Sequence, residues 1–447
     1  MADRPLTALP PRPIERLTKP LEVFLHLQAS GGVVLLFATA IALVLANSGA
    51  ADSYHAFWAT HITVGVGSAS LDYPSWYWVN DGLMAIFFFV IGLEVKRELV
   101  WGELSDKRNV ILPALAALGG ALAPIAIYVV LNSDPAGKPL WATPMATDIA
   151  FVVGIMALFG ARLPAGFKVF MLSLAIIDDI LAVIVIAAVF TAELAPLWIV
   201  GAVLGIAMVA TLNRLGVRRI GVYVLVGAFV WLCTLKSGIH PTVAGVILGL
   251  MTPAAAWLTP SQLVARMRPA LPRLEDVASA EAASTKLAPN PDHRDLVQQV
   301  AFVATESVSP LERIEHALHP WVGFVIMPLF ALANAGVPVS LDGLGEPVSL
   351  SIALALFIGK PVGIVLASWL VVKSKLASLP SGVGWGMLAA GGSLAGIGFT
   401  MALFVASLSS EGATLDAAKA GILMGSLMSM LVGSLLLYLA TRRVAAT

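Results

Sequence analysis

Four ionisable residues lie inside apolar stretches of the chain, where an ionised side chain is most unfavourable. Asp178 and Asp179 belong to the run SLAIIDDILAVIVIA, Asp148 to PMATDIAFVVG and Lys360 to LFIGKPVGIVL. If these runs are membrane helices, three aspartates and one lysine at their centres cost about 10–14 kcal/mol. A whole domain is stable by only about 5–15 kcal/mol. An Asp–Lys pair that merely locks helix packing does not account for three acids and one base. We therefore expect these residues to bind protons or a small cation.

The two adjacent aspartates cannot have the same role in a helix. Successive helix residues point about 100° apart, so Asp178 and Asp179 face different directions. One carboxylate can face an ion cavity while the other faces a neighbouring helix or the edge of that cavity. Lys360 can balance one of them, which leaves the remaining acids free to bind a proton or a cation.

The composition indicates that the elements positioning these residues are membrane helices. Of 447 residues, 58% are hydrophobic and 12% are charged, whereas a soluble domain has roughly 25% charged residues. This balance is typical of a polytopic membrane protein. The net charge of zero argues against a nucleic-acid partner. The single cysteine, Cys233, excludes an intrachain disulfide and a cysteine-based metal cluster.

Twelve apolar segments are long enough, or nearly so, to cross a hydrocarbon core of about 30 Å at 1.5 Å per residue. Their centres lie near Leu36, Phe87, Leu122, Phe151, Ala182, Gly205, Ala228, Val246, Met327, Ile358, Leu394 and Leu431. The eighth segment is short. The fold class we predict is an all-α polytopic membrane protein with 12 transmembrane helices.

The distribution of lysine and arginine predicts the orientation. With a cytoplasmic N-terminus and alternating sides, 23 basic residues fall in cytoplasmic segments and three in outer ones. This split follows the positive-inside rule, so both termini should be cytoplasmic. We expect a cytoplasmic segment at 1–28, a single transmembrane domain at 29–441 and a cytoplasmic tail at 442–447.

Two segments between the spans have patterns of their own. On the outer side, residues 61–73 (HITVGVGSASLDY) alternate apolar and small residues, which predicts a short β-hairpin. On the cytoplasmic side, residues 254–316 form a long loop rich in proline, alanine and charge. Apolar residues at helical spacing within 295–304 predict a surface helix in that loop.

The fourth and eleventh spans carry residues that interrupt helices. Pro144 precedes Asp148 in the fourth, and Gly396 and Gly398 lie within GGSLAGIGFTM in the eleventh. Such backbone is tolerated at membrane depth where it lines a cavity. Small-residue helix packing explains the glycines of the eleventh span equally well, and that alternative stays open.

The two interrupted spans occupy corresponding positions in the chain. Helices 3–5 and 10–12 are offset by seven spans, so the two groups run in opposite directions. We therefore predict two inverted three-helix repeats whose interrupted helices 4 and 11 cross at an ion site. Asp148 can offset facing helix N-termini and Lys360 facing C-termini. Thr147 offers a hydroxyl and a carbonyl oxygen to a small cation.

At these residues the chain resembles the bacterial sodium/proton antiporters called NhaA. The strings that carry the resemblance are WVNDGLMAIFFFVIGLEVKREL, ATDIAF, LAIIDD, LKSGIHPTVAGV, HPWVGFVIMPLFALANAG, GKPVGI and GIGFTMALF. They stand in the family's order and cover nearly the whole chain, apart from the N-terminal extension and much of the loop before the ninth span. Together they are specific, although any one of them alone would be weak.

The resemblance implies a role for each residue of the buried set. Asp178 and Asp179 would form the ion and proton site, with Asp179 as the direct sodium ligand and Thr147 assisting. Asp148 and Lys360 would balance the crossed helix ends. Lys360 would also pair with Asp178 in at least one state.

The resemblance also implies a pH-sensitive region. Glu94, Glu98 and Glu315 would belong to a cytoplasmic funnel and its pH-sensitive cluster. His240 falls where the family has a histidine linked to the pH response, although a lone histidine near a membrane edge is more often structural. For Asp81, packing or gating and ion passage remain equally open.

The implied function is electrogenic exchange of cytoplasmic sodium, and lithium, for periplasmic protons, regulated by pH. The protein would reside in the inner membrane among lipids as a homodimer joined through the 61–73 hairpin. It would need no cofactor and would not be an enzyme. The alternatives are a related-fold sodium-coupled organic-anion symporter and an intramembrane aspartate-dependent enzyme. No GxGD protease string occurs, and DDILAV lacks the third acid of a prenyltransferase motif.

Two positions depart from the family pattern. Leu181 stands where the family usually has a glycine, two residues after the double aspartate, and it would narrow the space beside the site. Glu312 stands where we expect a basic residue. With the longer loop before the ninth span, Glu312 puts the details of pH regulation in question but not the exchange itself.

Overall fold

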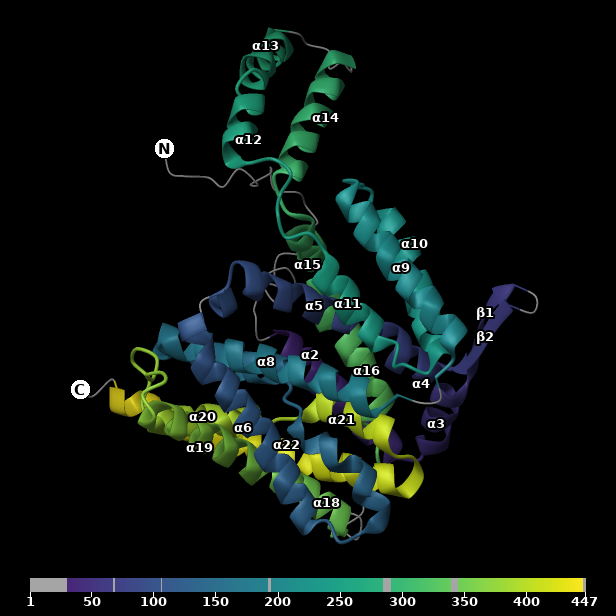
Figure 1. Ribbon diagram of the computed structural model, residues 1–447, viewed down its shortest axis with the longest axis vertical. Coiled ribbons are helices and arrows are strands. Elements are labelled where there is room, and N and C mark those ends of the chain that lie inside the picture. The colour runs from purple at the N-terminus through teal and green to yellow at the C-terminus, as the bar shows by residue number, and fades with distance from the viewer. Residues whose placement is uncertain are drawn as a thin grey trace.

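The fold is almost entirely helical, as the composition predicts (Figure 1). The computed structural model describes residues 30–66, 69–105, 107–191, 194–283, 291–338 and 345–444. The first half of the chain contains α2 (Ser30–Ala46), α3 (Ala51–Ala59), β1 (His61–Val66), β2 (Ala69–Pro74), α4 (Ser75–Tyr77), the π-helix η1 (Trp78–Leu83), α5 (Met84–Val100), the 3-10 helix η2 (Glu103–Ser105), α6 (Lys107–Leu131), the 3-10 helix η3 (Pro135–Met145), α7 (Ile149–Phe159), the 3-10 helix η4 (Gly160–Arg162), α8 (Ala165–Val189), α9 (Pro196–Arg214) and α10 (Ile220–Ser237).

The second half continues the same helical pattern to the end of the described chain. It contains α11 (Thr242–Met251), α12 (Pro260–Met267), α13 (Ala270–Ala283), α14 (Pro291–Glu306), α15 (Pro310–Trp321), the π-helix η5 (Val322–Ile326), α16 (Met327–Asn334), α18 (Pro347–Leu354), the π-helix η6 (Ala355–Gly359), α19 (Lys360–Lys373), α20 (Trp385–Ala395), α21 (Phe399–Ser409) and α22 (Gly412–Val444).

Seven helices of the described chain are long and apolar enough to cross a membrane, or up to ten spans if each bent pair is one span. The bent pairs are α2 with α3, η3 with α7, and α20 with α21. Two further elements fall short of this test. Helix α5 has 17 residues and carries four charges near its end, and α11 has ten residues. The count of twelve spans therefore stays a prediction.

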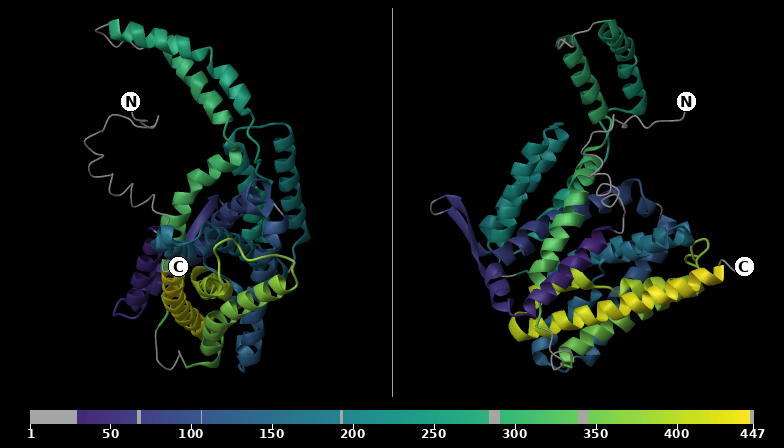
Figure 2. Two further views of the ribbon diagram at one scale, coloured as in Figure 1. Left: turned by 90° about the vertical axis from the view of Figure 1, so that its left-hand side faces the viewer. Right: turned by 180° about the vertical axis from the view of Figure 1, so that it is seen from behind.

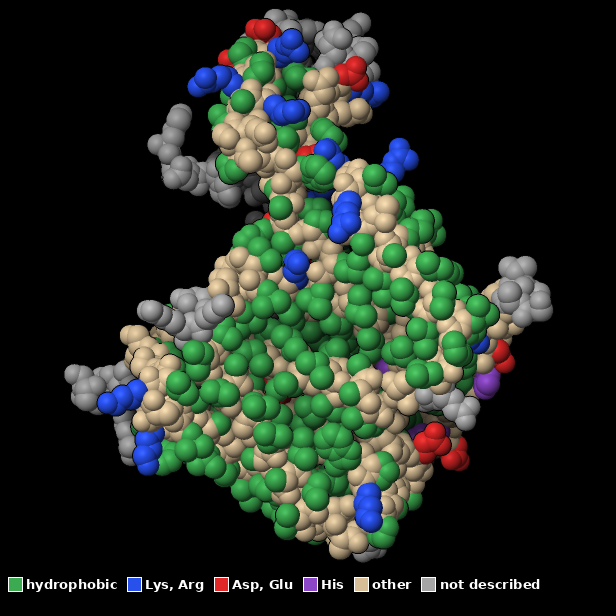
Figure 3. Space-filling model, in the orientation of Figure 1, with side chains coloured by type: hydrophobic (Ala, Val, Ile, Leu, Met, Phe, Trp, Pro, Cys, Tyr) green, Lys and Arg blue, Asp and Glu red, His purple; other side chains and the backbone are tan. Residues whose placement is uncertain are grey.

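The body of the molecule has the surface of a membrane protein. Large apolar side chains are exposed on several helices, including Val130 at 82%, Leu158 at 77% and Leu197 at 80%. Figure 3 shows apolar side chains over much of the body, while lysine and arginine gather mainly at the projecting end and the edges. Such an apolar surface is suited to contact with lipid chains.

A two-stranded hairpin occupies the place predicted from the alternating segment. Strands β1 and β2 are antiparallel, with His61 opposite Pro74 and Thr63 opposite Asp72. Thr63 Oγ1 donates to Asp72 Oδ1 at 2.7 Å, and His61 Nδ1 lies 3.3 Å from Asp72 Oδ2. The hydrogen bonds from Thr63 and His61 hold the pKa of the Asp72 carboxyl below its usual value.

The segment expected as a long cytoplasmic loop contains helices that project from the body. Helices α12, α13 and α14 stand apart from the other elements (Figures 1 and 2). The predicted helix at 295–304 lies within α14, and the expected loop boundary at 316 falls inside α15. Arg218, in the turn between α9 and α10, contacts the end of the projecting segment nearest the body. Its Nη1 lies 3.3 Å from Glu306 Oε2, and its Cζ lies 4.4 Å from the centre of the Trp257 ring.

Close backbone contact fixes the helix that carries Lys360. Helices α19 and α6 pack along each other, and a Cβ added at Gly363 would lie 2.1 Å from the carbonyl oxygen of Gly119. Only glycine permits this approach, which is typical of small-residue contacts between membrane helices. Lys360 begins α19 directly after the π-helix η6. Its position in the core therefore follows from the packing of α6 against α19.

Candidate functional site

Two interrupted helices meet at the centre of the body. The backbone between η3 and α7 breaks at 146–148, and that between α20 and α21 breaks at 396–398. The two pairs are bent by 43° and 44°. The Asp148 amide donates to Ile397 O at 2.7 Å, and Thr147 Oγ1 donates to Ala395 O at 2.8 Å. The predicted interruptions are thus present and bonded to each other, although the first half of the earlier one is a 3-10 helix containing Pro144.

Asp148 caps two helices at once. Its Oδ1 accepts from the amides of Ala150 and Phe151, at 3.1 and 3.4 Å, in its own helix α7. Its Oδ2 accepts from the Thr400 amide of α21 at 3.0 Å and from the Thr400 hydroxyl. Helix N-termini carry a partial positive charge, which a carboxylate stabilises. The geometry agrees with the expected role of Asp148, whose side chain is 1% exposed.

The second break contains glycines because neighbouring atoms leave no room for a Cβ, and not because the backbone has unusual dihedral angles. Gly396 and Gly398 both have negative φ, at −69° and −86°. A Cβ added at Gly396 would lie 2.5 Å from Ser429 Oγ and 2.6 Å from Leu356 O. A Cβ at Gly398 would lie 3.0 Å from Ala146 O, in the first break. The glycines therefore let three segments approach the same point.

The adjacent aspartates of α8 differ in their surroundings, as the helical geometry predicts. Lys360 Nζ lies 2.7 Å from Asp178 Oδ2, and the two side chains are 0% and 1% exposed. The other carboxylate oxygen of Asp178 is buried without a hydrogen-bond partner. Asp179 is 3% exposed, and no described residue forms a hydrogen bond or ion pair with it. Asp178 is thus partly neutralised, whereas Asp179 keeps a free carboxylate beside it.

Lys360 was expected to pair with Asp178 and to balance facing helix C-termini, and the structure shows the first of these contacts. Its ammonium forms the ion pair with Asp178, and within the described chain it makes no hydrogen bond to a carbonyl of either break. The preceding π-helix η6 ends at Gly359, and Pro361 has no N–H to donate to an earlier carbonyl. Irregular turns of this kind are frequent at functional sites. Lys360 follows this irregular turn directly, and its side chain is buried in the core.

Acidic residues near the C-terminal end of α5 face α15 through an arginine. Arg97 Nη1 forms an ion pair with Glu315 Oε1, and Arg97 Nη2 lies 3.5 Å from Glu98 Oε1. Glu94 lies one helical turn before Glu98 and is half-buried. The structure thus brings Glu98 and Glu315 together. It also adds Arg97, which the sequence reasoning missed although it lies beside Glu98.

Glu312 has a local structural role. Ser309 caps α15, its hydroxyl accepts from the Glu312 amide at 3.2 Å, and the Glu312 carboxylate accepts from the Ser309 amide at 3.2 Å. This reciprocal arrangement is a capping box, which requires an acceptor at the third helical position. A basic residue cannot accept these hydrogen bonds, so the start of α15 explains the acid at this position.

His240 and Asp81 form a further pair, and the His240 ring packs against Phe404 of α21 with 5.5 Å between the ring centroids. His240 Nε2 lies 3.4 Å from Asp81 Oδ1, and the other ring nitrogen, Nδ1, contacts Thr242 Oγ1 at 2.7 Å. The Thr242 amide donates to Nδ1 at 3.4 Å, which places the proton of a neutral ring on Nε2, facing Asp81. Trp231 donates to the Asp81 carbonyl at 3.1 Å. The pair joins η1 to the loop before α11.

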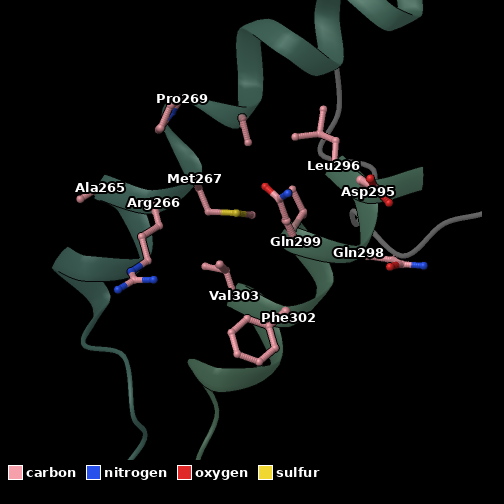
Figure 4. Close-up of a pocket in the computed structure, with 12 residues that line it drawn as sticks. Ala265, Arg266, Met267, Pro269, Asp295, Leu296, Gln298, Gln299, Phe302 and Val303 are labelled. Atoms are coloured by element: carbon pink, nitrogen blue, oxygen red, sulfur yellow. The ribbon is translucent and has the colours of Figure 1, made fainter. Parts of the chain in front are cut away.

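A hollow of about 670 Å³ lies between α12 and α14. Figure 4 shows Met267 and Gln299 directed toward each other across it, with Val303 and Phe302 nearby. Its lining is mainly apolar or uncharged, and it belongs to the projecting helices. The hollow does not contain the buried acids of α7 and α8, so it is distinct from the candidate ion site.

Comparison with known proteins agrees with this geometry. A family model described as Na+/H+ antiporter 1 matches residues 22–437. A protein of Rhodopirellula baltica named Na(+)/H(+) antiporter NhaA is 47% identical over 426 residues, covering 95% of each chain. Proteins of the same name from Oleidesulfovibrio alaskensis and Rhizobium meliloti are each 46% identical, covering 96% and 98% of this chain and 95% and 98% of their own. Neither the symporter nor the enzyme alternative has support from these relatives. The chain is therefore a transporter rather than an enzyme, and it belongs to the NhaA family of Na+/H+ antiporters.

Proposed function

We propose that the protein exports cytoplasmic sodium in exchange for periplasmic protons across the bacterial inner membrane. The observation that carries this proposal is the unequal pair of buried aspartates. Asp178 is paired with Lys360 and keeps one unpaired oxygen, while the next residue, Asp179, is buried and has no bonded partner in the described chain. Carboxylate oxygens bind either a proton or a small hard cation. The two substrates therefore compete for the same oxygens.

The competition couples the two ion flows. A deprotonated site attracts a sodium ion, for which Asp179 is the direct ligand and Thr147 supplies oxygen atoms. Movement of one repeat against the other then exposes the site to the periplasm, where protons displace the ion. The same carboxylates hold both substrates. We propose that the site changes sides only when sodium or protons occupy it, so that neither ion crosses without exchange for the other.

The exchange is electrogenic because more protons enter than sodium ions leave. The site has two carboxylates and the Lys360 amine available to carry protons, against one bound cation. Each net charge moved through the membrane potential is worth about 2.3 kcal/mol per 100 mV. The potential, negative inside, therefore drives sodium export. Lithium has the same charge and the same preference for oxygen ligands, and we propose that it is exported as well.

The architecture proposed for this mechanism has 12 spans with both termini in the cytoplasm. One inverted repeat comprises α6, the η3–α7 pair and α8. The other comprises α18 with α19, the α20–α21 pair and α22. The 61–73 hairpin joins two copies into a homodimer, and lipid covers the apolar surface. Glu94, Glu98, Glu315 and His240 regulate the exchange by pH from positions outside the ion site.

Everted membrane vesicles carrying an acid-inside proton gradient test the proposed function. Sodium, lithium or potassium is added at a series of pH values, and dissipation of the gradient is recorded. We expect sodium and lithium to dissipate the gradient, more strongly at alkaline pH, and potassium to have no effect. Vesicles without the protein are the control. No response to sodium or lithium at any pH would falsify the proposal.

A further inference from the structure

The last long helix reaches the second break with a polar side chain. Ser426 of α22 is 6% exposed, and its Oγ accepts from the Phe399 amide at 3.1 Å. Phe399 is the first residue of α21. The first four N–H groups of a helix have no partner within the helix, so each needs an acceptor from elsewhere. Ser426 is separated from Phe399 by 27 residues and supplies one such acceptor.

Side chains from two different segments accept from consecutive amides at the start of α21. The Phe399 amide donates to Ser426 of α22, and the next amide, of Thr400, donates to Asp148 of the first break at 3.0 Å. The residue at the N-cap position itself is Gly398, which has no side chain to contribute. All side-chain capping of α21 therefore comes from outside the second break. The first break differs, because Asp148 caps the helix that follows it.

We propose that Ser426 is a positioning residue for ion exchange. By holding the first turn of α21, it keeps Thr400 against Asp148 and so keeps the two breaks in register. Within the described chain Ser426 makes no hydrogen bond to a carboxylate of α8, so it acts through Asp148 and the backbone. The inference rests on the proposed exchange function, and it assigns α22 a part in the site rather than a purely supporting role.

A second serine on the same helix provides a matched control. Ser429 lies one turn after Ser426, is 0% exposed and has a hydroxyl without a hydrogen-bond partner. It lies beside Gly396, so it contacts the same break. Both serines are small, buried and on α22, and they differ in whether the hydroxyl accepts a hydrogen bond from α21. Replacing each by alanine therefore separates capping from packing.

The kinetic experiment uses the full-length protein in everted vesicles. We expect Ser426→Ala to raise the sodium concentration for half-maximal exchange about fivefold, the change that follows from losing about 1 kcal/mol of capping. Ser426→Thr, which keeps the hydroxyl, should remain near wild type. Ser426→Cys, which keeps the volume but accepts hydrogen bonds weakly, should resemble alanine. Ser429→Ala should change the half-maximal concentration by less than about twofold, since no hydrogen bond is lost.

A readout independent of transport separates this inference from the proposed function. Hydrogen exchange of the peptide that contains Phe399 and Thr400 is measured by mass spectrometry in the same variants. Exchange should accelerate in Ser426→Ala and Ser426→Cys, and stay at the wild-type rate in Ser429→Ala. The inference would be overturned if Ser426→Ala had wild-type hydrogen exchange and wild-type transport kinetics. It would also be overturned if Ser426→Ala and Ser429→Ala changed these two measurements equally. If sodium failed to dissipate the proton gradient with the wild-type protein, the proposed function would be contradicted instead. The rates of amide hydrogen exchange would still test whether Ser426 caps α21.

Discussion

Two of the charge clusters in this molecule differ in their exposure, one at its centre and one at the edge where α5 meets α15. At the centre, the side chains of Lys360 and Asp178 are 0% and 1% exposed. At the edge, Arg97 is 40% exposed while its partner Glu315 is 10% exposed. Solvent and salt screen the edge pair but not the central one. From this difference in exposure we expect a central charge to determine whether exchange occurs, and an edge charge to adjust its conditions.

The largest effect should follow from removing the free central carboxylate. Asp179→Asn keeps the size and shape of the side chain but removes its charge, so neither a sodium ion nor an exchangeable proton is held there. We expect exchange to fall below detection while the protein still inserts into the membrane. Sodium-dependent dissipation of the proton gradient in vesicles measures this, with Asp72→Asn in the surface hairpin as the control. Exchange at the wild-type rate in Asp179→Asn would place the ion elsewhere.

The next effect separates stability from exchange at the central pair. Lys360→Met leaves Asp178 buried without its cation, and removing one partner of a buried pair costs about 3–5 kcal/mol. We expect a lower temperature of thermal unfolding in detergent, together with loss of exchange. The double variant Lys360→Met/Asp178→Asn should recover most of the thermal stability but not the exchange. If the double variant were as unstable as the single one, the pair would not be the source of the loss.

The sequence predicted the central charges well because their chemistry is unusual where they lie. An aspartate or lysine inside an apolar run is unfavourable in any membrane fold, so Asp148, Asp178, Asp179 and Lys360 could be identified before any contact was known. The helical offset of 100° also predicted unequal surroundings for the adjacent aspartates. These inferences need only the composition of a run and the geometry of one helix.

The polar partners of the breaks could not be predicted in the same way. Thr400 lies 252 residues from Asp148, and serines and threonines are common in membrane helices without a capping role. Their roles depend on which helix packs where. Helices α12 to α14 were likewise underestimated, because their mixture of alanine, proline and charge has a weak apolar pattern. Only the hairpin at 61–73 was predicted almost to the residue, since strict alternation is a local signal.

A smaller effect should follow from disturbing the charge cluster at the edge, where Arg97 of α5 meets Glu315 of α15. Arg97→Gln removes the cation between Glu98 and Glu315, and partly exposed pairs contribute roughly 0–1 kcal/mol. We expect the half-maximal sodium concentration to change by less than about fivefold, and the pH dependence of exchange to shift because two acids lose their counter-charge. Lys96→Gln is the matched control, since no described residue forms an ion pair with Lys96. Complete loss of exchange in Arg97→Gln would show that a charge at the edge is as necessary for exchange as the charges at the centre.

The smallest effect should come from the surface hairpin, where the Asp72 side chain is about half exposed to water. Hydrogen bonds from Thr63 and His61 lower the pKa of Asp72 in the folded hairpin. Its contribution to hairpin order is therefore present above the ordinary pKa of about 3.9 and is lost as the pH falls through the lower folded value. Spin labels at Val64 and Leu71, which face each other across the strands, report that order through dipolar broadening. Broadening should be constant from about pH 8 to 5 and should weaken only below about pH 4. Asp72→Asn should weaken it slightly above about pH 5 and should make no difference once the wild-type carboxyl is protonated. A hairpin whose broadening changed near neutral pH would show that a different group, and not Asp72, controls its order.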